Sequence, residues 1–258
     1  MKKISTILIP FDFSKISEDA LEYAVKYVGN DENLKIMLGH ISNDRHMDEL
    51  KARFETVEKR HHDVLKNKIE WVSMRGELTE ALIQIQKSEQ IDLIIMGTSG
   101  GTSLEPTNTS KLVLEADCPV LVVPSNLGEF RLKKIALVLG KEEIDDTEVL
   151  RTLLNVSQKF NAKVHVITIE NRPETFGYSE TDENNENKIQ YFLENFYSEH
   201  VFIENPDVVD GILSYATQRD IDVITILPRN HTKKGQPSEG QLTELLTLHS
   251  PIPILAID

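Results

Sequence analysis

The sequence contains a single cysteine, Cys118, in 258 residues. One thiol can form neither an internal disulfide nor a cysteine-based zinc site. Cys118 begins an apolar run, so we expect it to be packed and unreactive. The low cysteine content is typical of a reducing compartment. The N-terminal apolar run also meets Asp12 too early for a signal peptide, and we therefore expect a cytoplasmic protein.

Basic residues are scarce relative to acidic ones. There are 28 Lys and Arg against 42 Asp and Glu, and the formal net charge is −14. Proteins that bind nucleic acid or anionic membranes rely on clustered Lys and Arg. We therefore expect neither nucleic acid nor a membrane as a partner. No apolar run approaches the ~20 residues that a transmembrane helix needs.

Clusters that could carry catalysis or hold a metal ion are also missing. The eight histidines are scattered, apart from His61 and His62 in a charged stretch with a helical period. Adjacent positions on a helix point in different directions, which is poor geometry for one metal ion. We expect both side chains to be exposed and predict no metal site. No nucleophile has a neighbouring base, so we predict no catalytic residues.

The most informative feature that is present is an internal repeat. The stretch ELTEALIQIQKSEQIDLIIMG (77–97) is matched by DVVDGILSYATQRDIDVITIL (207–227). The offset is 130 at Asp92 and Asp222, and 134 at Pro119 and Pro253. A period of this length is too long for a solenoid. We therefore predict two related domains, 1–126 and 132–258, joined within the turn-rich segment 124–134.

Within each half, short apolar runs alternate with stretches of helical period. In the first half the runs cover 6–11, 35–41, 69–74, 91–96 and 119–123. Val, Ile and Leu fill them almost without polar alternation, as in strands buried on both faces of a sheet. This order predicts an α/β fold with a five-stranded parallel sheet and right-handed crossovers in each half.

The two halves carry different charged insertions. Residues 43–67 have the pattern of a charged helix, and residues 170–187 are rich in Glu, Asp and Asn. We expect the first to be a solvated helix and the second to be a mobile acidic loop.

Three stretches of the first half resemble the universal stress protein family. ILIPFDFSKISEDALEYA (7–24) is similar to the family's first strand, its Pro-x-Asp-x-Ser turn and the following helix. DLIIMGTSG (92–100) resembles the fourth strand and its loop, and ADCPVLVVP (116–124) resembles the last strand. Since the second half repeats this order in part, the chain resembles tandem universal stress proteins.

The resemblance implies a fold and a ligand. Each sheet would have strand order 3-2-1-4-5 with flanking helices, and the two domains would pack as an intramolecular pseudo-dimer. The ligand would be ATP or another adenine nucleotide, with or without Mg²⁺. The protein would be a stress-response module rather than an enzyme with fast turnover. The sequence leaves open whether two chains form a homodimer and which proteins are partners.

In strand order 3-2-1-4-5 the order of the strands reverses between strands 1 and 4, and ligands bind to open parallel sheets at this point, outside the carboxyl ends of the strands. Asp12 would accept hydrogen bonds from an adenine amine or a ribose hydroxyl. Gly97 and Gly100 would let the backbone approach ribose and phosphate, and Thr107 would lie where helix N-termini favour anions. The candidate binding residues are Pro10, Phe11, Asp12, His40, Ile41, Met96, Gly97, Thr98, Gly100, Thr107, Asn108 and Thr109.

A purely structural interpretation of these residues stays open. Asp12 could accept backbone N–H groups at a strand–helix corner, with Ser14 or Ser17 as the helix cap. The two glycines could serve turn geometry alone, and Thr107 or Thr109 could be only a cap. The family's nucleotide-binding members have nine residues between Gly-x-x-Gly and the next Gly. Here six residues (101–106) precede Thr107, and Pro106 stands nearest to the place of that Gly.

The second half departs further from the pattern. Gly140 stands where Asp12 stands, Leu227 replaces Gly97, and Asn230 replaces Gly100. We therefore expect the second half to be a structural partner of the first rather than a nucleotide site. The alternatives for the whole chain are a scaffold or interaction protein without nucleotide and, more distantly, a slow nucleotide hydrolase.

Overall fold

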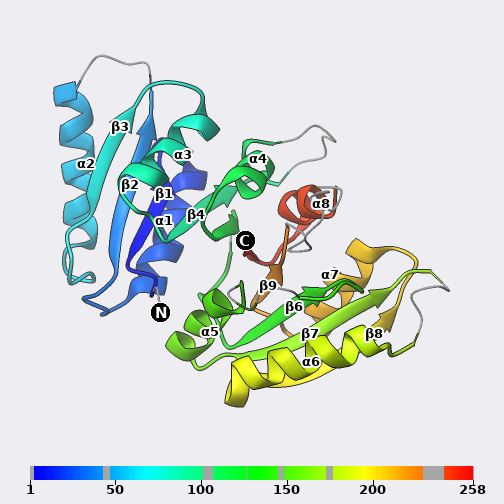
Figure 1. Cartoon of the computed structure of the whole chain (residues 1–258). Helices are drawn as coiled ribbons and strands as arrows, with labels where there is room; N and C mark the ends of the chain where they lie inside the picture. The colour runs from blue at the N-terminus through cyan, green and yellow to red at the C-terminus, as the bar shows by residue number, and fades with distance from the viewer. Residues whose placement is uncertain are drawn as a thin grey trace. The chain divides into compact units, whose positions relative to one another are not determined.

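The computed structural model describes residues 3–42, 47–100, 107–125, 127–144, 147, 149–172, 177–228 and 241–257. The chain divides into two compact units, which we call unit 1 (Met1–Phe130) and unit 2 (Arg131–Asp258). The boundary between them lies within segment 124–134. Each unit is built around its own parallel sheet (Figure 1). No helix among the described residues is long and apolar enough to cross a membrane.

Unit 1 alternates strands and helices along the whole of its length. Its elements are β1 (Thr6–Pro10), α1 (Lys15–Val28), β2 (Lys35–Ile41), α2 (Met47–His61), β3 (Glu70–Met74), α3 (Leu78–Ser88), β4 (Leu93–Thr98), α4 (Asn108–Glu115) and β5 (Val120–Pro124). The strand order is β3-β2-β1-β4-β5, and all the pairs are parallel. This is the predicted order 3-2-1-4-5.

Unit 2 repeats the plan. Its elements are β6 (Lys134–Leu139), α5 (Val149–Phe160), β7 (Lys163–Glu170), α6 (Glu180–Leu193), the 3-10 helix η2 (Glu194–Phe196), β8 (Tyr197–Glu204), α7 (Val208–Gln218), β9 (Val223–Ile226), α8 (Gln241–His249) and β10 (Ile254–Ala256). Its strands are parallel in the order β8-β7-β6-β9-β10. The predicted fold of two tandem five-stranded α/β domains is confirmed. The pseudo-dimer stays a prediction.

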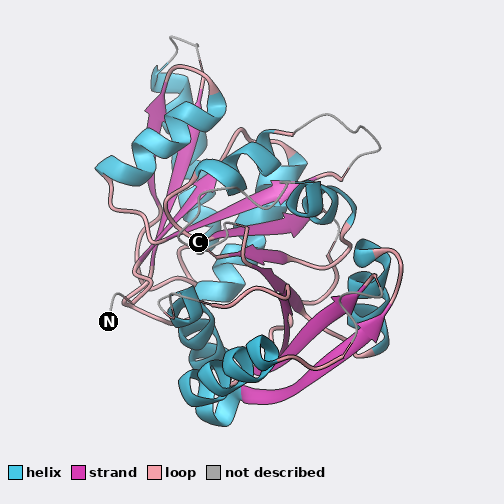
Figure 2. Ribbon diagram, turned by 45° about the vertical axis from the view of Figure 1, so that its right-hand side comes forward, coloured by secondary structure: helices cyan, strands magenta, loops and turns pink. Residues whose placement is uncertain are grey.

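Both faces of each sheet are covered by helices (Figure 2). In unit 1, α1 and α2 are linked by a 2.6 Å hydrogen bond from Arg60 to Glu18, and α3 contacts α4. The central strands are therefore largely apolar, and Ile7, Leu8 and Ile9 have no exposed surface. Cys118 is buried, as predicted. Burial on two faces explains why the strands show no polar alternation in the sequence.

The repeated aspartates Asp92 and Asp222 have the same structural role in the two units. Oδ2 of Asp92 accepts hydrogen bonds from the backbone of Ser5 at 2.9 Å and of Thr6 at 3.1 Å. Oδ2 of Asp222 accepts hydrogen bonds from the backbone of Lys133 at 2.7 Å and of Lys134 at 3.0 Å. Each carboxylate thus satisfies N–H groups at the start of the unit's first strand. This explains why the repeat is clear at these positions.

The prediction of a mobile acidic loop over 170–187 is wrong for 180–187, which belong to a helix, and residues 173–176 lie outside the described residues. β7 extends to Glu170, and α6 begins at Glu180. Ser179 and Asp182 form a capping box at the start of this helix, while Ile189 and Leu193 are buried on its inner face. Capping and two apolar anchors outweigh the acidic composition. In the first half, α2 covers Met47–His61 of the predicted 43–67, and residues 43–46 lie outside the described residues.

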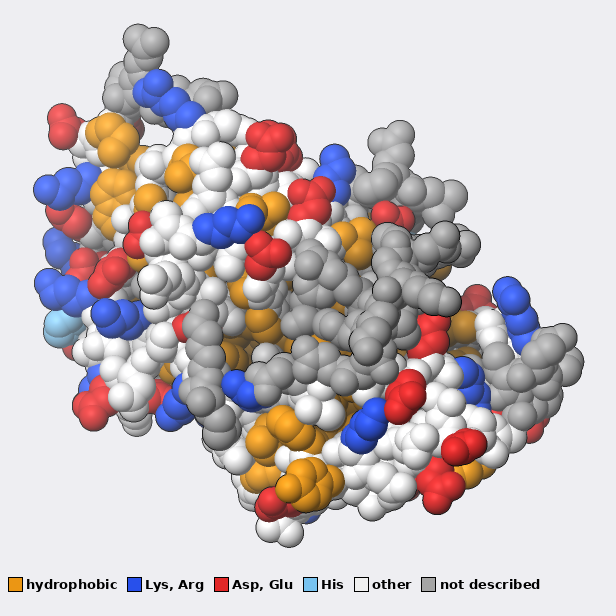
Figure 3. Space-filling view, viewed as in Figure 1, with side chains coloured by type: hydrophobic (Ala, Val, Ile, Leu, Met, Phe, Trp, Pro, Cys, Tyr) orange, Lys and Arg blue, Asp and Glu red, His pale blue; other side chains and the backbone are white. Residues whose placement is uncertain are grey.

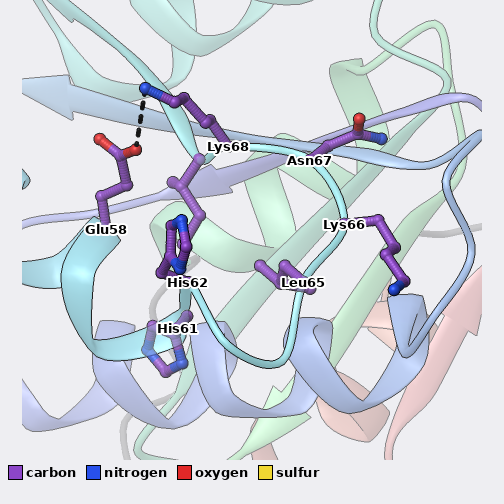
Figure 4. Close-up of a pocket in the computed structure, with 8 residues that line it drawn as sticks. Glu58, His61, His62, Leu65, Lys66, Asn67 and Lys68 are labelled. Atoms are coloured by element: carbon purple, nitrogen blue, oxygen red, sulfur yellow. Dashed lines mark ion pairs between the residues drawn. The ribbon is translucent and has the colours of Figure 1, made fainter.

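The surface of α2 carries charges of both signs. Figure 3 shows acidic and basic side chains intermingled along this edge of unit 1. The helix buries Phe54, Val57 and His61 against the sheet and α1. The predicted exposure is therefore confirmed for His62, whose side chain is 71% exposed, and wrong for His61, whose side chain is 5% exposed. His61 points toward α1, with Nε2 3.7 Å from Oε1 of Glu22 (Figure 4).

Burial lowers the pKa of His61 below its ordinary value, against the opposing effect of Glu22. Above the unfolded pKa of about 6.5 the imidazole is neutral in both the folded and the unfolded state, so its titration does not reduce the unfolding free energy. Below it the unfolded chain takes up the proton first. We therefore expect the unfolding free energy of unit 1 to decrease as the pH is lowered below about 6.5. His61 would account for up to ~1.4 kcal/mol of this decrease per pH unit.

Urea titrations at pH 7.5 and 5.5 test this expectation. They can be followed by the fluorescence of Trp71, the chain's only tryptophan, which lies in β3 of unit 1. His61→Gln should reduce the loss of stability between the two pH values, whereas the exposed control His62→Gln should retain it. An equal loss in wild type and His61→Gln would contradict the assignment.

Candidate functional site

Asp12 lies in the turn between β1 and α1, where the backbone leaves the sheet. Its Oδ1 accepts hydrogen bonds from the amide of Ser14 at 2.9 Å and the hydroxyl of Ser17 at 2.8 Å. Ser14 in turn caps α1. Partial burial raises the pKa of the Asp12 carboxyl, but the bonds from Ser14 and Ser17 outweigh it, and the pKa lies below its ordinary value. Asp12 is therefore ionised at neutral pH.

A cavity of about 160 Å³ opens beside Asp12 at the carboxyl ends of β1, β2 and β4. Six of the predicted binding residues line it: Pro10, Phe11, Asp12, Ile41, Met96 and Gly97. Of the other lining residues, the sequence analysis named Ser14 and Ser17 only as helix caps and did not single out Ile16, Gly39 and Leu78. The cavity is smaller than the ~300–1,000 Å³ of typical ligand pockets. It can enclose only part of a nucleotide.

Gly97 has a structural role that the sequence did not reveal. A Cβ placed on it would lie 2.4 Å from the carbonyl oxygen of Ile16 and 2.7 Å from the Ile16 side chain. Real Cβ atoms do not approach backbone this closely. The glycine is therefore required by the approach of α1 to the end of β4, whether or not a ligand binds. A substitution at Gly97 cannot serve as a test of binding.

We expect Gly97→Ala to lower the unfolding free energy of unit 1 by about 2–3 kcal/mol, since overpacking against backbone cannot be relieved by a rotamer change. Urea denaturation followed by Trp71 fluorescence measures the effect. The control is Gly128→Ala, because a Cβ on Gly128 meets nothing within 4 Å. Equal stability of the two variants would show that α1 and β4 can separate without cost.

His40 faces the α2 side of the sheet rather than the cavity. Its Nδ1 donates a hydrogen bond to the carbonyl oxygen of Phe11 at 2.7 Å. Its ring belongs to an aromatic cluster with Phe11, Phe13, Phe54 and Trp71. The structure therefore assigns His40 to packing beside the predicted site. The spacing of these aromatic residues along the chain gives no periodic signal, so the sequence analysis missed the cluster.

Phe13 has a positive φ of 64°, which is unfavourable for a residue with a Cβ. Contacts with neighbouring rings hold it there, with centroids 5.0 Å away for Phe11 and 4.9 Å away for Phe54. The guanidinium of Arg53 covers the ring of Phe13 at 3.7 Å from its centroid. The cluster thus fixes the turn that carries Asp12.

The residues predicted to hold phosphate lie at the end of β4 and the start of α4. Oγ1 of Thr98 accepts a hydrogen bond from the amide of Gly100 at 3.2 Å, and Gly100 has a positive φ of 68°. Thr107 caps α4, Asn108 is exposed, and Thr109 is buried. The segment 101–106, including Pro106, lies outside the described residues.

In unit 2 a lysine lies where unit 1 has its aromatic cluster. Counted from the first residues of β1 and β6, Lys141 takes the place of Phe13. Its Nζ donates hydrogen bonds to Oδ2 of Asp182 at 3.0 Å and to the carbonyl oxygen of Gly177 at 3.0 Å, and lies 3.6 Å from Oε1 of Glu170. The side chains of Asp182 and Glu170 are 2% and 8% exposed. Lys141 therefore compensates two buried carboxylates.

A second polar group adjoins this network. His200 takes the place of Trp71, and its side chain is 2% exposed. Its Nε2 lies 3.0 Å from the hydroxyl of Thr168, and its Nδ1 lies 3.8 Å from Oε2 of Glu186. Burial lowers the pKa of His200, against the opposing effect of Glu186. In unit 2 the ion-paired Lys141, together with His200 and the ring of Phe202, thus occupies the space that unit 1 fills with an aromatic cluster.

We expect Lys141→Met to lower the unfolding free energy of unit 2 by about 2–4 kcal/mol. Loss of one partner of a fully buried ion pair costs ~3–5 kcal/mol, and about a quarter of the Lys141 side chain is exposed. Thermal unfolding followed by circular dichroism measures the change.

Lys188→Met is the matched control. Lys188 pairs with Glu143, but the two side chains are 33% and 48% exposed, so its loss should cost less than about 1 kcal/mol. If both variants are equally stable, Lys141 does not hold the network together.

A larger hollow of about 260 Å³ lies between the end of α2 and the start of β3 (Figure 4). Three of its polar side chains, those of Glu58, Asn67 and Lys68, have partners within unit 1. Nζ of Lys68 lies 3.8 Å from Oε1 of Glu58, and the amide of Asn67 donates to the carbonyl oxygens of Glu32 and Leu34. This hollow is far in sequence from the predicted binding residues, and none of them lines it.

The comparison with known families agrees with the fold and the Asp12 turn. A family model described as the universal stress protein family matches residues 3–124. Unit 1 belongs to the universal stress protein family. A universal stress protein of Thermus aquaticus is 34% identical over 82 residues, which are 29% of this chain and 60% of the relative. The matched stretch thus spans less than two thirds of that relative.

Solved structures extend the likeness in fold to both units. A universal stress protein from Archaeoglobus fulgidus has a TM-score of 0.72 at 17% identity, covering 98% of each chain. A putative universal stress protein from Pseudomonas aeruginosa has a TM-score of 0.61 at 18% identity, covering 99% of this chain and 94% of its own. At these identities the likeness establishes the tandem fold and nothing about ligands.

Proposed function

We propose that the protein is a stress-response module whose unit 1 binds an adenine nucleotide at the crevice between β1 and β4. The observation that carries the proposal is the cavity beside Asp12, located where strand order reverses. Its lining combines apolar residues, among them Pro10, Ile41 and Met96, with the ionised carboxylate of Asp12. This combination suits a flat base and a ribose with hydrogen-bond donors.

Asp12 presents an oriented carboxylate to a ligand. The Ser14 amide and the Ser17 hydroxyl donate to Oδ1, and the Ser14 side chain and the Asp12 backbone also interact with the carboxylate. Since each carboxylate oxygen can accept more than one hydrogen bond, the group can also accept one from an exocyclic amine or a ribose hydroxyl. The hydrogen bonds to Oδ1 hold the carboxylate in place before the ligand arrives, which reduces the entropic cost of binding.

A scaffold that binds proteins without nucleotide is the second candidate. It is favoured by the small volume of the cavity in unit 1 and by the Lys141 network in unit 2. In this alternative both units serve as structural partners, and Asp12 does no more than order the turn before α1. The two candidates differ in one measurable property, which is affinity for small adenine compounds.

Isothermal titration of wild type and Asp12→Asn with AMP tests the proposal. Asn retains an acceptor oxygen for Ser14 and Ser17 but loses the charged acceptor, so we expect binding to weaken by about 10- to 100-fold. Asp63→Asn is the control, because it removes the same charge from a side chain that is fully exposed.

Two results would count against the proposal. Absence of a binding heat when wild type is titrated with millimolar AMP would favour the scaffold. Binding that Asp12→Asn leaves unchanged would place the ligand elsewhere.

A further inference from the structure

We infer that the crevice of unit 1 recognises the uncharged nucleoside and discriminates against its phosphates, so that affinity falls from adenosine through AMP to ATP. The inference rests on the proposed function, since it concerns the same crevice. The inference goes further than the proposed function, because a site for adenine nucleotides could equally prefer the triphosphate. Four features of unit 1 argue against that preference.

The first feature is the charge of the cavity lining. Asp12 is the one charged side chain among the eleven described residues that line the cavity, and it is an ionised acid. The others are apolar residues, glycines and two serines, whose hydroxyls already bond within the turn. An anion entering this cavity meets a like charge and, among these lining residues, no cation. Like charges at contact distances repel most where water is partly excluded.

The second feature is the position of the nearby basic side chains. Lys15, at the start of α1, pairs with Asp19 one turn along the same helix. Arg53 is held over the ring of Phe13, on the α2 side of the sheet. Both cations are thus directed to groups of unit 1 outside the cavity lining. Neither lines the cavity.

The third feature is the composition of the segment that follows the cavity. Residues 93–110 contain no Lys or Arg and one acid, Glu105, and the next basic residue, Lys111, is an exposed residue of α4. Proteins that hold triphosphates commonly supply a lysine or arginine for the terminal phosphates. The protein as a whole carries a net charge of −14, which adds to the repulsion of polyanions.

The fourth feature is the capping of α4. The amide of Thr107 donates to Oγ of Ser110 at 3.0 Å, and the amide of Ser110 donates to Oγ1 of Thr107 at 3.1 Å. These donors of the first turn are therefore satisfied within the helix. A phosphate group would have to displace the cap to use them. The side chain of Thr109, a predicted phosphate ligand, is buried.

The experiment is a titration series with adenosine, AMP, ADP and ATP at pH 7.5, with and without Mg²⁺. We expect adenosine to bind at least roughly tenfold more tightly than ATP. The ratio of the affinity for adenosine to the affinity for ATP should decrease when NaCl is raised from about 0.05 to 0.5 M, because salt screens repulsion between exposed charges. Asp12→Asn should also decrease this ratio, because it should weaken the binding of adenosine and leave the binding of ATP unchanged. The control Asp63→Asn should leave it unchanged.

The outcomes separate the two proposals. Tighter binding of ATP than of adenosine would overturn the inference while the proposed function stands. Absence of binding by all four compounds would overturn both. A preference for adenosine that persists unchanged in Asp12→Asn and at high salt would contradict an electrostatic origin of the discrimination.

Discussion

The crevice of unit 1 depends on one backbone contact, the approach of Ile16 to Gly97. A side chain at position 97 would lie 2.4 Å from the Ile16 carbonyl oxygen, so the start of α1 can cover the end of β4 only because the residue is glycine. This contact sets the position of the Asp12 turn, which is fixed on its other side by Phe13 and its aromatic neighbours. The lining of the cavity follows from these two supports.

The second unit shows what happens without this constraint. Leu227 occupies the position of Gly97, and α5 begins at Val149, after a connection over 140–148, whereas α1 begins at Lys15, after 11–14. Where unit 1 has Phe13, unit 2 has Lys141, held by Asp182 and Glu170. The two units thus fill the same position of the fold differently. Unit 1 packs aromatic rings there, and unit 2 places an ion-paired lysine there.

The fold could be predicted from the sequence because strands buried on both faces leave uninterrupted Val, Ile and Leu runs, and because Asp92 and Asp222 repeat for a shared structural reason. Half of the candidate residues lie together at the cavity, since strand order alone brings the ends of β1, β2 and β4 to one edge. Other features could not be predicted. The burial of His61, the cap that makes α6 a helix and the Lys141 network all arise from contacts between elements distant in sequence.

The central claim is that unit 1 has a crevice beside Asp12 that takes an adenine nucleoside, whereas the Lys141 region of unit 2 is occupied by the unit's own ion pairs. The most direct test is a two-dimensional ¹H–¹⁵N NMR titration of the full chain with adenosine. The account predicts shift changes confined to amides around Asp12, Ile41 and Gly97, with Lys141 and Asp182 unaffected. Changes centred on Lys141 and Asp182, or none around Asp12, would contradict it.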